Sequence, residues 1–203
     1  MSRWRSVRIV LWSLVVVAGI GAAALMTGII QSPERAMLQE GSSIAVGGPF
    51  RLTTHKGEVL SDADLRGRPF LVFFGFTHCP DICPTTLAEL TRRYEALGAA
   101  ADKLTTLLIT VDPQRDTQEV LAQYMEAFDP RFIALRGTLA ETKAIAKAYK
   151  AFFQKVPLDG SSYTMDHQTI VYMMDRAGRF VGSLDHHESE ETQLAKLRRL
   201  IAG

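Results

Sequence analysis

An uninterrupted apolar stretch at residues 69–76 (PFLVFFGF) restricts the possible folds more than any other feature of the chain. Apolar and polar side chains do not alternate in it, so a strand formed by these residues has to be buried on both faces. A second buried strand is expected at residues 104–111, and apolar residues at helical spacing between 84 and 97 separate the two. The sequence therefore predicts neighbouring strands at the centre of a sheet that is covered on both sides.

The remaining segments extend this pattern to the order β-α-β-α-β-α-β-β-α. Alternating strands and helices predict an α/β domain with a mainly parallel sheet and helices on both faces. The closing strand pair and helix are typical of a thioredoxin-like domain. The expected elements are a hairpin at 50–54 and 58–60, a helix at 117–128 with Asp116 as its N-cap, a strand at 132–135, a helix at 140–149, strands at 169–174 and 179–183, and a helix at 190–201.

The N-terminal region predicts a membrane anchor. Residues 9–30 are almost entirely apolar and would form a helix about 33 Å long, which is sufficient to cross a bilayer. Arginines are the only charged residues in segment 1–8, so the positive-inside rule assigns that segment to the cytoplasm. The alternative is a cleaved signal peptide, for which the alanines at 22–24 offer a cleavage site. The length of the apolar run favours the retained transmembrane helix.

The domain boundaries follow from this anchor. Residues 31–48 contain several glycines, serines and a proline and are expected to form a linker, and residues 49–203 are expected to form the thioredoxin-like domain. We expect a single-pass protein of an inner, cytoplasmic-type membrane whose C-terminal domain is extracytoplasmic, on the periplasmic or intermembrane-space side. The chain carries a net charge of +1 with its N-terminal arginines included, so the domain gives no reason to expect a nucleic-acid partner.

The chain contains only two cysteines, Cys79 and Cys83, placed between the first buried strand and the first long helix. Amide groups and the dipole at a helix start stabilise thiolates. The i, i+4 spacing brings both sulfurs to one helix face, where two soft ligands suit copper. The alternative is a structural disulfide, but closing so short a loop contributes only about 2 kcal/mol. A functional cysteine pair is the better interpretation.

A tight metal site needs a third ligand, and His167 is the best candidate among the five histidines. It precedes the expected strand 169–174, and in a thioredoxin-like sheet the loop that enters this strand faces the cysteines. The other histidines have simpler interpretations. His55 is expected in a hairpin turn, His78 adjoins Cys79 and should point away from it, and His186 and His187 are expected in a solvated turn.

Three motifs resemble those of a known family, the SCO/SenC proteins. Residues 74–84 (FGFTHCPDICP) resemble the cysteine signature of that family, and residues 111–117 (VDPQRDT) resemble its second motif. Residues 166–169 (DHQT), followed by 172–175 (YMMD), are similar to the third. The resemblance extends over residues 50–201, with the motifs in the order and at the separations typical of the family.

The resemblance implies a copper chaperone with a thioredoxin-like fold. Copper, as Cu+ or Cu2+, would be held by Cys79, Cys83 and His167 and delivered to the binuclear copper site of cytochrome c oxidase subunit II or a similar copper acceptor. One departure from the family is Gln168, where serine is common. This departure leaves copper binding intact and concerns the hydrogen bonds beside the histidine.

Several further residues near the three motifs invite an interpretation. Asp112 is a candidate for orienting the ligands or contributing charge near the metal, or is a turn residue. Asp166 is expected either to accept a hydrogen bond from the ring of His167 or to cap the start of the strand. Met165, Met173 and Met174 offer soft sulfur atoms, but core packing is the better interpretation for them.

An enzymatic alternative remains open from the sequence. Cys79 and Cys83 would be the redox pair of a dedicated thiol-disulfide oxidoreductase that keeps the target cysteines reduced. A general thioredoxin would have Cys-x-x-Cys and a facing proline, and residues 165–169 contain no proline. A peroxiredoxin would need threonine or serine three residues before its reactive cysteine, where this chain has Phe76 or Pro80. The sequence thus leaves a copper carrier and a dedicated reductase as the two hypotheses.

Overall fold

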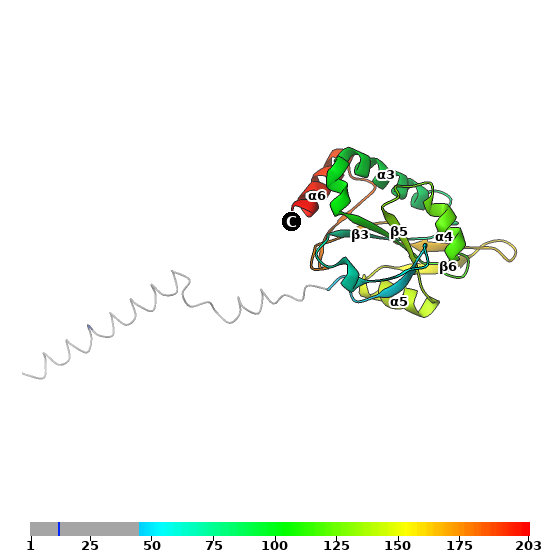
Figure 1. Ribbon diagram of the computed structural model, residues 1–203. Helices are drawn as coiled ribbons and strands as arrows, with labels where there is room; N and C mark the ends of the chain where they lie inside the picture. Colours follow the sequence, from blue (N-terminus) through cyan, green and yellow to red (C-terminus); the bar gives the residue numbers. More distant parts are fainter. Residues whose placement is uncertain (1–11, 13–44) are drawn as a thin grey trace, which may run out of the picture. The chain divides into compact units, whose positions relative to one another are not determined.

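Two parallel strands, β3 (Phe70–Gly75) and β4 (Thr105–Thr110), form the centre of the domain (Figure 1). All six residues of β3 are buried, which confirms that this strand is covered on both faces.

The computed structural model describes residues 45–203 and residue 12. The expected tail, almost all of the expected anchor and most of the expected linker lie outside the described residues.

No helix in the described part of the chain combines the length and the apolar character needed to cross a membrane.

The main sheet has seven strands in the order β2-β1-β5-β4-β3-β8-β9. Only the β3–β4 and β4–β5 pairs are parallel, and the other four are antiparallel. The expectation of a mainly parallel sheet was wrong, because hairpins add antiparallel strands on both sides of the central three. The third central strand is β5 (Phe132–Arg136), and the strands on either side are β1 (Arg51–Thr54), β2 (Val59–Ser61), β8 (Val171–Met174) and β9 (Phe180–Leu184).

Helices cover both faces of this sheet, as the alternating pattern predicted. In Figure 1, α3 and α6 lie on one side of the strands and α5 lies on the other. The described helices are α3 (Ile82–Leu97), α4 (Gln118–Met125), α5 (Leu139–Ala148) and α6 (Glu190–Ala202), with short 3-10 helices η1 (Asp62–Leu65) and η2 (Gly98–Lys103).

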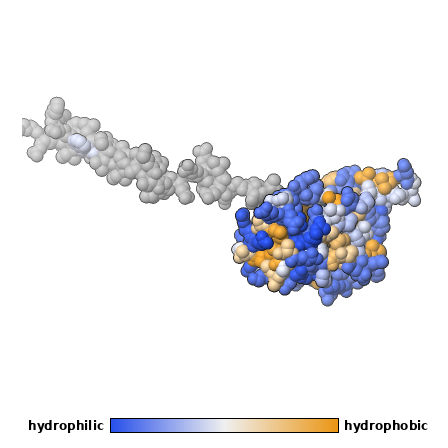
Figure 2. All heavy atoms as spheres, turned by 90° about the horizontal axis from the view of Figure 1, so that it is seen from above, coloured by the Kyte–Doolittle hydropathy of each residue, from blue (hydrophilic) through white to orange (hydrophobic). Residues whose placement is uncertain are grey.

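Aromatic side chains join the layers on each face. On the α3 side, the Tyr94 ring packs edge-on against Phe132 at 4.8 Å, and its hydroxyl lies 2.7 Å from the hydroxyl of Thr106. On the opposite side, Phe74 of β3 packs against Tyr149, which follows α5, at 5.6 Å. Edge-to-face contacts of this kind add roughly 0.5–1.5 kcal/mol to the burial of the rings. Figure 2 shows the outer surface, which is largely hydrophilic with separate apolar patches.

A second, two-stranded sheet was not predicted from the sequence. Strands β6 (Phe153–Pro157) and β7 (Tyr163–His167) form an antiparallel hairpin outside the main sheet. These segments are short, largely exposed or half-buried, and mixed in character, so they lack the apolar pattern that identifies buried strands. The hairpin positions His167, one of the three candidate metal ligands, because β7 ends at this residue.

The start of α4 also differs from the expectation. Thr117, rather than Asp116, is the N-cap, and its side chain accepts a hydrogen bond from the backbone N–H of Val120. Both residue types cap helices well. Asp116 is instead fully buried and accepts hydrogen bonds from distant segments, which no local pattern reveals.

Gly75, the last residue of β3, determines how closely α3 approaches the sheet. A Cβ atom at this position would lie 3.0 Å from the sulfur of Cys83, 3.0 Å from the ring of Phe73 and 3.1 Å from Leu108. Each of these distances is shorter than an ordinary van der Waals contact. The missing side chain of Gly75 therefore gives the Cys83 sulfur its place against the strand.

Replacing Gly75 by alanine should reduce the free energy of unfolding by about 1–3 kcal/mol, because the added methyl group overpacks this contact. Denaturant unfolding followed by circular dichroism measures the loss. The double variant Gly75→Ala with Cys83→Ala removes the sulfur that the methyl group meets, so its loss should be smaller than the sum of the two single losses. Additive losses would show that the contact with Cys83 is not the origin of the strain.

Candidate metal centre

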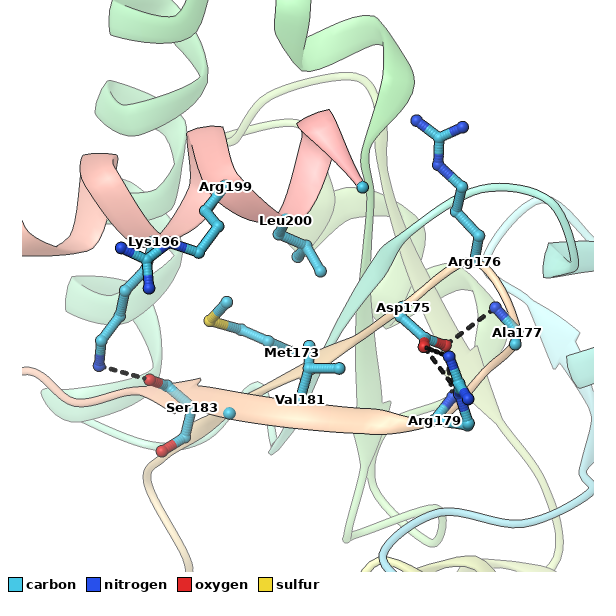
Figure 3. A pocket seen from close by; sticks show the side chains of 12 residues that line it. Met173, Asp175, Arg176, Ala177, Arg179, Val181, Ser183, Lys196, Arg199 and Leu200 are labelled. Carbon is cyan, nitrogen blue, oxygen red and sulfur yellow. Dashed lines mark hydrogen bonds and ion pairs between the residues drawn. The ribbon is translucent and has the colours of Figure 1, made fainter. Parts of the chain in front are cut away.

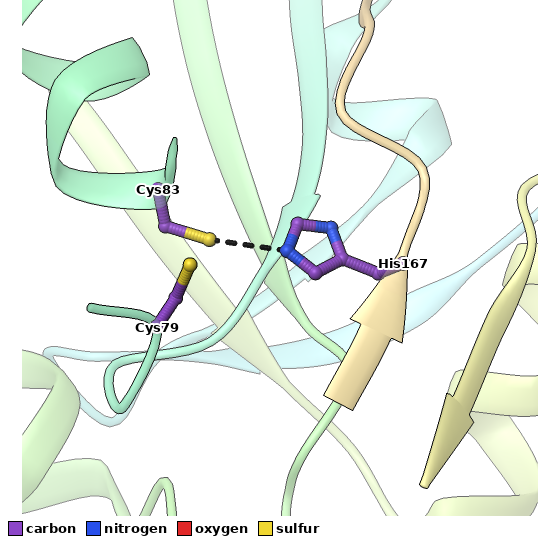
Figure 4. Close-up of side chains that lie close together, drawn as sticks. All are labelled: Cys79, Cys83 and His167. Carbon is purple, nitrogen blue, oxygen red and sulfur yellow. Dashed lines mark hydrogen bonds between the residues drawn. The ribbon is translucent and has the colours of Figure 1, made fainter. Parts of the chain in front are cut away.

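Cys79, Cys83 and His167 come together at one end of the sheet although they belong to separate segments. Cys79 lies in the loop between β3 and α3, Cys83 lies in the first turn of α3, and His167 ends β7. One ligand atom from each residue lies within 4.8 Å of the others. Figure 4 shows both sulfurs and the imidazole facing a common point. The structure thus brings together the three residues that the sequence singled out.

The imidazole of His167 is held in the orientation and tautomer that a ligand needs. Its Nδ1 lies 3.0 Å from the backbone carbonyl of Gln168, and a carbonyl only accepts hydrogen bonds, so Nδ1 carries the proton. The lone pair of the neutral ring is then on Nε2, which lies 3.3 Å from the sulfur of Cys83. A backbone carbonyl is a common partner of this kind for metal-binding histidines. Because the contact uses the main chain of Gln168, it does not depend on the side chain at this position.

Aromatic packing fixes the same ring from the sides. Phe73 and Phe76 form T-shaped contacts with the imidazole of His167, with ring centroids 6.2 Å and 5.6 Å away. Both phenylalanines are buried. Phe73 lies in β3, and Phe76 directly follows this strand. The strand that carries the cysteine loop therefore also positions the histidine.

The two cysteines differ in exposure and in proton affinity. Cys79 is half-buried, whereas Cys83 is fully buried. A hydrogen bond from the Cys83 thiol lowers the pKa of Cys79 to about 3. The same hydrogen bond, together with burial, raises the pKa of Cys83 above its ordinary value. The metal-free pair therefore holds one thiolate and one thiol, and a bound cation would replace the remaining proton.

Asp116 supports the loop that carries Cys79. The sequence predicted this residue only as a helix cap and not as part of the site. Its buried carboxylate accepts hydrogen bonds from the backbone N–H of Thr77 at 3.2 Å and from the hydroxyls of Thr77 and Thr110 at 2.6 Å and 2.5 Å. His78, next to Cys79, lies 3.8 Å from the same carboxylate. Asp116 thus ties the loop to β4. Its place in the second motif was the only signal in the sequence.

Asp112 contacts none of the three candidate ligands in the described structure. It is buried and accepts hydrogen bonds from Arg115 and from the hydroxyl of Tyr163, the latter at 3.0 Å. Arg115 also donates to the backbone carbonyl of Tyr163 at 2.9 Å and stacks on its ring at 3.7 Å. Because Tyr163 is the first residue of β7, this group anchors the strand that ends at His167.

Asp166 does not accept from the ring of His167, because the carbonyl of Gln168 takes that hydrogen bond. The alternation of side chains along β7 explains the difference: Asp166 is exposed whereas His167 and Met165 are buried. Met173 and Met174 are buried in the same core, as expected of packing residues.

His55 lies in the turn between β1 and β2, as the sequence predicted. Its ring is buried, and Nδ1 accepts a hydrogen bond from the backbone N–H of Ala134 at 3.1 Å, which joins the first hairpin to β5. Burial lowers the pKa of this histidine. His55 therefore has a structural role away from the cysteines.

A groove of about 520 Å³ lies apart from the three residues, between the β8–β9 hairpin and α6 (Figure 3). Met173 and Val181 line it from the hairpin, and Lys196, Arg199 and Leu200 line it from α6. None of the three candidate ligands lines this groove. It is a separate surface of the domain.

The chain is similar in sequence to a family of known proteins. The sequence model of the SCO1/SenC family matches residues 39–202. A SCO2-like protein of Rickettsia prowazekii is 36% identical over 179 residues, which cover 85% of this chain and 86% of the relative. The chain spans about half the length of the yeast, human and mouse mitochondrial SCO proteins that it matches.

Solved structures share the fold of the described domain. Bradyrhizobium japonicum ScoI with copper bound superposes with a TM-score of 0.73 and 43% identity, covering 77% of this chain and 99% of the other. Yeast Sco1 with copper bound gives a TM-score of 0.71 and 34% identity, covering 78% of this chain and 90% of the other. These similarities confirm the expected thioredoxin-like fold. With its motifs, its fold and the match to the family model over most of its length, the chain belongs to the SCO1/SenC family.

Proposed function

We propose that this protein is a copper carrier that binds one copper ion through Cys79, Cys83 and His167 and passes it to another protein. The observation that carries the proposal is the convergence of two sulfurs and the Nε2 atom of a fixed imidazole within 4.8 Å. The copper-bound structures of Bradyrhizobium ScoI and yeast Sco1 support the choice of metal.

The donor set suits an ion that has to be released again. Two thiolates are soft ligands that favour Cu+, and the imidazole also accepts Cu2+. Three protein ligands leave the ion open to an incoming donor, so transfer proceeds by exchange of one ligand at a time. Cys79 is the more exposed sulfur and lies in a loop, so it is the ligand that an acceptor replaces most readily. Cys83 and His167 are buried and hold the ion until last.

We further propose that the acceptor is the binuclear copper site of cytochrome c oxidase subunit II. The three motifs shared with the SCO/SenC proteins support this destination. The expected anchor at residues 9–30, with segment 1–8 in the cytoplasm and 31–48 as linker, would hold the domain of residues 49–203 on the extracytoplasmic face of the membrane. Asp112 and Asp116 would then act without touching the metal. Asp112 holds the strand that ends at His167, and Asp116 holds the loop that carries Cys79.

A dedicated thiol-disulfide reductase is a second candidate function, favoured by the lowered pKa of Cys79. The half-exposed Cys79 thiolate would attack a disulfide of the target, and the thiol of Cys83 would lose its proton and resolve the mixed disulfide. The target leaves with two reduced cysteines, and Cys79 and Cys83 become a disulfide that an external thiol reductant has to reduce.

Removing any one ligand should weaken copper binding. We expect the reduced chain to bind one Cu+. The variants Cys79→Ser, Cys83→Ser and His167→Ala should each bind Cu+ more than roughly 100-fold more weakly, because losing a ligand costs more than losing a group that only orients one. Competition with a chromophoric Cu+ chelator measures the affinities. His78→Gln is the matched control, because it removes a histidine beside Cys79 that is not a ligand. Wild-type affinity in His167→Ala would refute the three-ligand site.

Delivery can be tested by mixing the copper-loaded chain with the metal-free, reduced copper-binding domain of subunit II. Copper should move to the acceptor and restore the absorption spectrum of its binuclear centre. The same experiment with an oxidised acceptor separates the two functions. A chain that reduces the acceptor but never transfers copper would be a reductase alone.

The reactivity of Cys79 should be nearly independent of pH across the neutral range. Below its pKa of about 8.5, an ordinary thiol is alkylated roughly tenfold faster for each unit by which the pH rises, because the thiolate fraction increases. Because the pKa of Cys79 is lowered to about 3, its thiolate is already formed well above that pH and is lost only as the pH falls toward 3. Iodoacetamide labelling followed by mass spectrometry distinguishes Cys79 from Cys83. A steep rise in Cys79 labelling between about pH 6 and about pH 8 would contradict this prediction.

A further inference from the structure

A second group of potential metal ligands lies outside the cysteine site. Asp185, His186 and His187 form the turn between β9 and α6, and one ligand atom from each lies within 4.8 Å of the others. The two imidazoles face each other with centroids 3.9 Å apart, and Nδ1 of His186 lies 3.6 Å from the carboxylate of Asp185. The sequence alone favoured a solvated turn here, because it gave no reason for the three side chains to converge.

The turn that carries these side chains is held firmly at its backbone. The side chain of Gln193, which is buried, donates to the carbonyl of Asp185 at 2.8 Å, and the N–H of Glu188 donates to the same carbonyl at 3.0 Å. The N–H of His187 donates to one carboxylate oxygen of Asp185 at 2.9 Å. The backbone is therefore fixed while both imidazoles remain exposed to solvent, so a small rotation of exposed rings suffices to enclose an ion.

This turn lies at the same end of the sheet as the cysteine site. Leu184, the last residue of β9, pairs with Val171, and Val171 pairs with Phe73 near the end of β3. One small cavity is lined both by His186 and by Thr86, which lies one helical turn after Cys83. The turn therefore borders the helix that carries one of the sulfur ligands.

We propose that Asp185, His186 and His187 form a second, exposed site for a divalent transition-metal ion, with copper(II) bound most tightly. Two imidazoles and a carboxylate are borderline to hard donors, and sites of this type bind copper(II) in preference to the other divalent first-row ions. The donor set is complementary to the cysteine site, whose sulfurs favour the reduced ion. If the proposed copper-carrier function holds, the exposed site captures copper(II) and passes it, still as copper(II), to the cysteine site, whose imidazole also accepts that ion.

The binding test isolates the turn from the cysteines. The full chain carrying Cys79→Ser and Cys83→Ser, in detergent at about pH 7.5, is titrated with copper(II) alone. We expect one bound copper(II) whose electron paramagnetic resonance spectrum shows nitrogen coupling, without the absorption of a copper–sulfur bond. Adding His186→Gln and His187→Gln should reduce the copper(II) affinity by more than roughly 100-fold, which exceeds the cost of losing a group that only orients a metal ligand.

Two further variants decide whether the turn itself is responsible. His78→Gln, in the same cysteine-free background, removes an exposed histidine elsewhere and should leave the affinity unchanged. Asp185→Asn keeps the oxygen that accepts from His187 but removes the charge, and should weaken binding by roughly tenfold, the lower end of the same range. Unchanged binding after loss of both His186 and His187, or loss of binding in His78→Gln, would overturn the proposal.

The capture role needs a separate measurement with the cysteines present. Stopped-flow absorption of the copper–sulfur bond follows the loading of the reduced chain with copper(II). Loading should be roughly tenfold slower in the double variant His186→Gln with His187→Gln. Concentrating an ion near its site raises the rate of binding by at least about this factor. Equal loading rates would reject capture while leaving the binding result to stand, and loading in neither protein would instead count against the cysteine site.

Discussion

Burial of β3 on both faces is the constraint on which the rest of the structure depends. The strand has to be covered by α3 on one side and by the end of α5 on the other, and Gly75 lets α3 start directly against the end of the strand. That close start places Cys83 in the core and leaves Cys79 in a short loop above it. The cysteine geometry is thus a consequence of how one central strand is packed.

The chemistry of the site follows from where protons are held. The carbonyl of Gln168 fixes one proton on Nδ1 of His167, and the two sulfurs share another. A cation bound between the two sulfurs would displace the proton that they share. The buried carboxylate of Asp116 adds no ligand, but its hydrogen bonds to Thr77 keep the loop from opening when that proton leaves. In the proposed carrier, release then depends on an acceptor rather than on loosening of the fold.

The sequence predicts the parts of this structure that rest on local patterns. Apolar runs locate β3 and β4, helical spacing locates α3, and the cysteine position follows from both. The β6–β7 hairpin escapes prediction because it is half-exposed, and with it the strand position of His167. Hydrogen bonds between distant segments escape for a different reason. The partners of Asp116 and Asp112 are up to 51 residues away, so a capping or turn role is the natural local interpretation.

The two groups of potential ligands differ in exposure and in donor atoms, as the proposed transfer between them requires. The turn of Asp185, His186 and His187 is exposed and offers nitrogen and oxygen, whereas the other group is largely buried and offers sulfur. An exposed site of moderate affinity exchanges its ion quickly with solvent, and a buried site with thiolates holds it tightly. An ion that moves from the first to the second gains softer ligands and loses contact with water. In the proposed transfer, the difference between the donor atoms sets the direction, with no change of fold.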